Sequence, residues 1–127
     1  MKNLLMILCF TLLVSCDIDG YGPHVKTNGV EVFYKPDTLK DQAKAFSELM
    51  SGNGYGKDGD VSFQLVKDSI VHINMVTQEK YFKDESMDYA LNAVSILSSL
   101  EIFKDEKVQL HICNEVFEKQ RSLKIVD

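Results

Sequence analysis

Two stretches in the middle of the chain alternate between apolar and polar side chains. Apolar residues recur at every second position from Val61 and again from Val71, and Lys67, Asp68 and Ser69 form a turn between the two stretches. Successive side chains of a β-strand point to opposite faces of a sheet. The pattern therefore predicts a β-hairpin, with strands over residues 61–66 and 71–75 and one buried face.

Three other segments also favour strands. Residues 30–35 are rich in β-branched and aromatic side chains, residues 107–112 alternate like the hairpin, and residues 122–126 form a shorter candidate. Residues 114–120, between the last two, are expected to form a single helical turn.

Two segments repeat their apolar residues at helical spacing. Thr38 can cap a first helix whose apolar stripe is formed by Leu39, Ala43, Phe46 and Met50, and Gly52 ends it. The glycine-rich residues 52–60 then form a connector. A second helix is expected over residues 84–100, which carry a broad apolar stripe.

The predicted order is strand, helix, strand, strand, helix, strand, with a possible final strand. Helices with one apolar stripe and strands with one apolar face are best satisfied when both helices pack on one side of a single sheet. We therefore predict an α+β fold, with two helices on one face of a four- or five-stranded, mainly antiparallel sheet in the ferredoxin-like (split βαβ) order.

The other face of this sheet is the candidate functional surface. It would be a mixed polar and apolar face, as protein contact surfaces often are, and the residues predicted to bind a partner there are Phe33, Gln64, His72, Asn74 and His111. The alternatives, left open, are that the N-terminal tether, the C-terminal segment or solvent covers this face.

The chain offers little for metal binding or catalysis. In the ferredoxin order the first strand would lie between the backbones of His72 and His111, roughly 9 to 10 Å apart, so the ligands of a zinc site with Cys113 would have to converge across that strand. His111 and Cys113 lie two residues apart on one strand, but no third group that would orient them is evident. We therefore expect no catalytic residues, no metal and no cofactor.

The N-terminus indicates export. Lys2 precedes an apolar run of 11 residues from Leu4 to Val14, which is too short to span a bilayer as a helix. The run ends in Leu13-Val14-Ser15-Cys16, which resembles the lipobox of bacterial lipoproteins.

The resemblance implies that residues 1–15 are a signal peptide and that Cys16 becomes the lipidated first residue of the mature chain. Residues 16–28 would then be a flexible tether and residues 29–127 a single domain, similar to the small α+β domains of other lipoproteins. An ordinary secretory signal and an uncleaved anchor are the alternatives.

Charge and cysteine content narrow the possible partners. The formal net charge is −5, and it becomes −6 when residues 1–15 leave, because they contain Lys2 and no acidic residue. A negative chain is not expected to bind nucleic acid or to be attracted to anionic lipids. Cys113 is the only remaining thiol, so no disulfide can form within the domain.

These observations predict a lipoprotein of the bacterial cell envelope. It would be anchored to the inner or outer membrane, facing the periplasm or the exterior, and would serve as a non-enzymatic module that binds an unidentified protein. A periplasmic immunity or inhibitor lipoprotein is the first alternative, because an acidic domain can match a basic active-site cleft. A small hydrolase or thiol-dependent enzyme centred on His111 and Cys113 is the second.

Substitution of Cys16 tests the lipid anchor. In a host that processes lipoproteins, radiolabelled palmitate should enter the wild-type chain and the Cys9→Ser control but not Cys16→Ser, because the Cys16 thiol is the predicted acceptor. A wild-type chain that stays unlabelled would refute the anchor.

Overall fold

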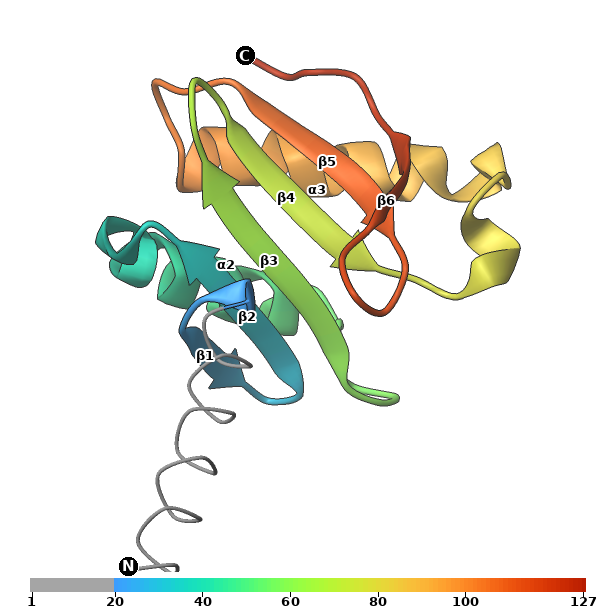
Figure 1. The fold of residues 1–127 in the computed structure, drawn as a ribbon, viewed down its shortest axis with the longest axis horizontal. Coiled ribbons are helices and arrows are strands. Elements are labelled where there is room, and N and C mark those ends of the chain that lie inside the picture. Colours follow the sequence, from blue (N-terminus) through green and yellow to red (C-terminus); the bar gives the residue numbers. More distant parts are fainter. Residues whose placement is uncertain (1–19) are drawn as a thin grey trace, which may run out of the picture.

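The computed structural model describes residues 20–127, which fold into one sheet and two main helices (Figure 1). The elements in chain order are β1 (His24–Thr27), β2 (Val30–Lys35), the 3-10 turn η1 (Asp37–Leu39), α2 (Lys40–Gly52), β3 (Val61–Lys67), β4 (Val71–Val76), the 3-10 turns η2 (Glu79–Tyr81) and η3 (Glu85–Met87), α3 (Asp88–Glu101), β5 (Val108–Cys113) and β6 (Lys119–Ser122).

The predicted sheet architecture is wrong. The sheet has six strands in the sequential order β1-β2-β3-β4-β5-β6, not four or five in a split βαβ order. It is mixed, because β2 and β3 are parallel and β4 and β5 are parallel, while the other three neighbouring pairs are antiparallel. Each helix therefore connects two adjacent strands, with no strand inserted between them.

This order gives the two helical connections opposite handedness. Both connections step in the same direction across the sheet, but the β2–β3 pair runs opposite to the β4–β5 pair, because β3 and β4 are antiparallel. Both helices cover the same face of the sheet (Figure 1). One of the two connections must then be left-handed, which is rare among βαβ units.

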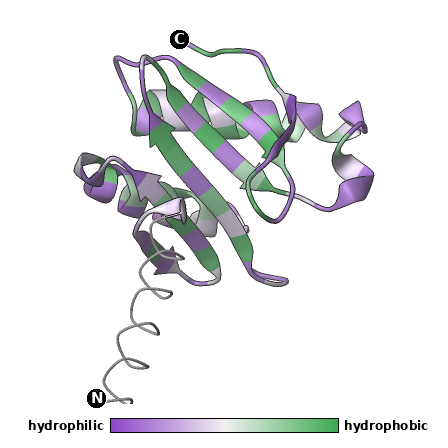
Figure 2. Ribbon diagram, viewed as in Figure 1, coloured by the Kyte–Doolittle hydropathy of each residue, from purple (hydrophilic) through white to green (hydrophobic). Residues whose placement is uncertain are grey.

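The core lies between the sheet and the helices. The four central strands present alternate apolar residues to it, a banding visible in Figure 2. Phe46 of α2 meets Phe63 of β3 edge to face, with ring centroids 5.0 Å apart, and both side chains are fully buried. The helical spacing predicted for α2 is confirmed, since Ala43, Phe46 and Met50 all face this core.

The ends of the domain differ from the prediction. β1 lies within residues 16–28, which were expected to be tether. β6 occupies residues 119–122, so it overlaps the end of the helical turn expected over 114–120 and the start of the possible final strand expected over 122–126. Beyond β6, Val126 forms a single antiparallel bridge to Val108. The sheet thus has an additional strand at one edge, and its final strand begins earlier than predicted.

The glycine-rich connector packs backbone against backbone. Gly29 and Gly56 both have positive φ, and a Cβ atom built on Gly29 would lie only 2.6 Å from the carbonyl oxygen of Gly56. These glycines are therefore explained by a close contact between the β1–β2 turn and the loop after α2.

The signal peptide and the lipidation of Cys16 concern positions outside residues 20–127, so they remain predictions. Among the described residues, no helix has the length and apolar character needed to cross a bilayer.

Truncation of Phe63 tests the core. Phe63→Ala should lower the free energy of unfolding by about 3–5 kcal/mol, because it removes a fully buried ring and leaves a cavity against Phe46. Denaturant titration measures the change. Lys44→Ala, on the exposed side of α2, is the control and should change it by less than about 0.5 kcal/mol. A similar small loss for Phe63→Ala would contradict this packing.

Candidate functional site

The five residues predicted to bind a partner share one face of the sheet, opposite the helices. Each occupies a strand position whose neighbours along the chain point into the core. They come from four strands: Phe33 from β2, Gln64 from β3, His72 and Asn74 from β4, and His111 from β5.

The two histidines are in direct contact. His72 Nδ1 lies 2.8 Å from His111 Nε2, and the two rings stack with centroids 5.0 Å apart. The expected separation of 9 to 10 Å is wrong, because β4 and β5 are hydrogen-bonded neighbours and no strand lies between them.

Two residues that the sequence did not single out extend this pair. His72 Nε2 lies 3.1 Å from both carboxylate oxygens of Asp68, and His111 Nδ1 lies 2.6 Å from Ser122 Oγ. One set of tautomers satisfies the whole chain: Ser122 donates to His111, His111 donates to His72, and His72 donates to Asp68.

This hydrogen-bonded chain is better suited to structure than to catalysis. The pKa of His111 is lowered to about 4, mainly by burial and also by the positive charges of Lys119 and His72. A general base works best when its pKa is near the working pH, so His111 would be a weak base for Ser122. These hydrogen bonds instead link the turn before β4, which carries Asp68, to β5 and to the edge strand β6, which carries Ser122.

A second polar pair lies beside the histidines. Asn74 Nδ2 donates to Gln64 Oε1 at 3.0 Å, and Gln64 Nε2 donates to the carbonyl oxygen of Tyr21 at 3.2 Å. Asn74 Oδ1 is buried and accepts no hydrogen bond from the described residues.

Aromatic side chains cover this polar pair. The rings of Tyr21, Phe33 and Phe117 meet edge to face, with centroids 5.1 to 5.9 Å apart. Tyr21 precedes β1, and Phe117 belongs to the loop between β5 and β6.

The covered face leaves little area for a partner. Only 6% of Gln64, 5% of Asn74 and 3% of His111 is exposed. Phe33 and His72 are half-buried. The chain's own end segments therefore occupy much of the face that was predicted to meet a partner.

Cys113 is also enclosed. Its side chain is fully buried, and burial raises the pKa of its thiol to about 11. A buried, protonated thiol is a poor nucleophile. In residues 20–127 there is also no group of three or more His, Cys, Asp or Glu residues placed to hold a metal ion.

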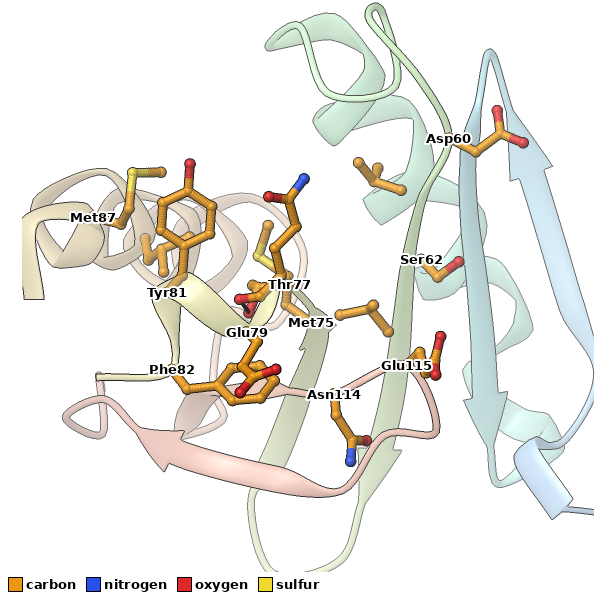
Figure 3. Close-up of a pocket in the computed structure, with 14 residues that line it drawn as sticks. Asp60, Ser62, Met75, Thr77, Glu79, Tyr81, Phe82, Met87, Asn114 and Glu115 are labelled. Atoms are coloured by element: carbon orange, nitrogen blue, oxygen red, sulfur yellow. Dashed lines mark hydrogen bonds between the residues drawn. The ribbon is translucent and has the colours of Figure 1, made fainter. Parts of the chain in front are cut away.

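A cleft of about 850 Å³ opens elsewhere, and sequence reasoning missed it. Its walls come from the start of β3, the end of β4, the segment from η2 to the start of α3, and the loop after β5 (Figure 3). These segments are far apart in the chain, so no local pattern could have indicated the cleft.

The cleft combines apolar and acidic groups. Phe82 and Met87 contribute apolar surface, while Glu79 and Glu115 bring carboxylates and no lining residue is basic. Asp60 also lines the cleft and pairs with Lys26 at 3.5 Å. Glu79 and Glu115 form no ion pair with any described residue, so their charges are available to a ligand.

Arg121 fixes one wall of the cleft. Its Nη1 donates to both carboxylate oxygens of Asp88, at 2.7 and 2.8 Å, and its Nε donates to the carbonyl oxygen of Phe82 at 3.0 Å. Nη2 also donates to the carbonyl oxygen of Asp84 at 3.0 Å. One side chain from β6 thereby holds the η2–α3 segment in place.

Comparison of the chain with protein-family models, with curated proteins and with solved structures gave no match.

The buried histidine predicts a pH dependence of stability. In the unfolded chain an imidazole titrates near pH 6.5, whereas the pKa of His111 in the folded protein is about 4. Between these values the unfolded chain binds the proton and the folded protein does not. The free energy of unfolding should therefore fall as the pH drops from 6.5 to 4, by about 3 kcal/mol.

Denaturant titrations at pH 4.5, 5.5 and 7 measure this slope. His111→Gln should flatten it, because the variant lacks the imidazole whose pKa burial lowers. Equal slopes for the two proteins would show that His111 is not the titrating group.

Proposed function

We propose that this chain is a lipoprotein of the bacterial cell envelope, held at a membrane by a lipid on Cys16, whose folded domain binds a protein partner and catalyses no reaction. The anchor is supported by the apolar run and the Leu13-Val14-Ser15-Cys16 motif. The binding role is supported by the cleft and its unpaired carboxylates.

The observation that carries the proposal is the chemistry of the cleft. Apolar surface from Phe82 and Met87 lies beside the exposed carboxylates of Glu79 and Glu115, with no basic group among the lining residues. Such a site matches a segment that has a Lys or Arg side chain next to an apolar one. The charged head would meet the carboxylates, and the apolar neighbour would fill the cleft.

The polar groups on the opposite face favour binding over catalysis. His111 is too weak a base to activate Ser122 well, and the thiol of Cys113 is buried and protonated. The two residues on which a hydrolase or thiol-dependent enzyme would depend are therefore poorly placed for it.

An immunity or inhibitor role is a second candidate, favoured by the same unpaired carboxylates. A cleft lined by acidic residues can hold a basic loop that belongs to the active site of a toxin or hydrolase. The two roles differ in what the partner does. For an inhibitor, the activity of the co-purified partner should fall when the complex forms.

Charge reversal in the cleft tests the proposal. Intact cells of the native host are treated with a cross-linker, the anchored chain is recovered, and co-purifying proteins are quantified by mass spectrometry. Glu79→Lys/Glu115→Lys should reduce recovery of the main partner at least ten-fold, because like charges would then meet in the cleft.

Glu48→Lys/Asp105→Lys is the matched control. It makes the same change in net charge at exposed positions outside the cleft and should leave recovery unchanged. Partner recovery that survives the cleft variant would count against the cleft as the binding site.

A further inference from the structure

One side of α3 carries an apolar ridge that residues 20–127 leave largely exposed. The ridge consists of Tyr89, Ala93, Ile96 and Leu100, spaced four, three and four residues apart. This is the spacing of the seam of a coiled coil. Tyr89 is 90% exposed, Leu100 66% and Ile96 46%, whereas Leu91 and Val94 on the opposite side of the helix are buried in the core.

The ridge is not an ordinary solvated helix surface. No charged residue occurs between Asp88 and Glu101, so the twelve residues of α3 from Tyr89 to Leu100 offer water only apolar or neutral polar side chains. An exposed helix face normally carries charged residues. A contiguous apolar patch on an otherwise acidic protein marks an interaction surface.

The sequence of the ridge is complementary to itself. A two-fold axis crossing α3 between Val94 and Ser95 would place Tyr89 of one copy against Leu100 of the other. It would also place the small Ala93 against the bulky Ile96. Two antiparallel helices could then approach closely at the centre of the seam, where the small Ala93 of each copy faces the bulky Ile96 of the other. A helix of an unrelated protein has no reason to match this symmetry.

We propose that α3 pairs antiparallel with α3 of a second copy of this chain, forming a two-fold symmetric dimer along the Tyr89–Leu100 ridge. This inference is independent of the cleft.

Electrostatics permit this pairing despite the net charge of −5. The seam itself is uncharged, and the carboxylate of Asp88 at one end is paired with Arg121 at 2.7 Å. Antiparallel alignment also brings the positive end of each helix dipole toward the negative end of the other.

The size of the ridge sets the strength of the dimer. Its exposed side chains present on the order of 500 Å² per copy, so burial of the whole ridge would remove at most about 1,000 Å² from water, the lower limit for a specific interface. We therefore expect a weak, reversible dimer.

Disulfide trapping of the full chain in its producing cells tests the register. Tyr89→Cys/Leu100→Cys and Ala93→Cys/Ile96→Cys each place two cysteines opposite one another across the seam. Both variants should give a cross-linked dimer on non-reducing gels. Ala45→Cys/Glu48→Cys, on the exposed side of α2, is the control and should stay at the wild-type level.

A charge introduced into the seam provides a second test of the dimer. Ile96→Glu added to the Tyr89→Cys/Leu100→Cys variant should reduce cross-linking at least ten-fold, whereas Ala45→Glu should not. Circular dichroism should show that each variant is folded, because the substituted positions are exposed.

Two results would overturn the proposal. One is dimer formation no higher than in the control for both cysteine pairs. The other is cross-linking of the seam cysteines to a different protein, which would assign the ridge to a heterologous partner.

Discussion

The chain covers one face of its sheet with helices and part of the other with its own aromatic side chains, and most of the structure follows from this. Helices α2 and α3 cover one face with an apolar core, while Tyr21 and Phe117 cover part of the other. Polar side chains trapped under the second cover must bond to one another, because buried polar groups without partners are costly. The contacts of Gln64 with Asn74 and of His72 with His111 are therefore consequences of burial, and they hold β3, β4 and β5 together.

Features with a short sequence period were predictable. The alternation from Val61 and from Val71 indicated β3 and β4, and the spacing of Phe46 and Met50 indicated the buried side of α2. The same alternation placed the five candidate residues on one face, and the structure has them there. These properties depend on neighbours in the chain, which a single sequence contains.

The order of the strands was not predictable in this way. A split arrangement lets both helices cover one face with right-handed connections, whereas the sequential order requires one left-handed connection. Nothing in residues 30–113 encodes that choice locally. A single sequence likewise could not predict that Tyr21 would bond to Gln64, that His111 would contact Ser122, or that Glu79 and Glu115 would line one cleft. Each brings together residues distant in the chain, including edge strands whose polar sequences lack a clear period.

The domain is hydrogen-bonded to residues only a few positions after Cys16, and this has a mechanical consequence. Lys35 Nζ donates a hydrogen bond to the carbonyl oxygen of Gly20 at 2.8 Å, and Gln64 Nε2 donates one to the carbonyl oxygen of Tyr21. Gly20 follows Cys16 by only four positions, and four extended residues reach at most about 14 Å, half the thickness of a bilayer's hydrocarbon layer. A lipid on Cys16 would thus hold the domain close to the membrane through a very short linker. The domain would rest against the headgroups in a narrow range of orientations and would meet its partners at the bilayer surface, not deep in the periplasmic space.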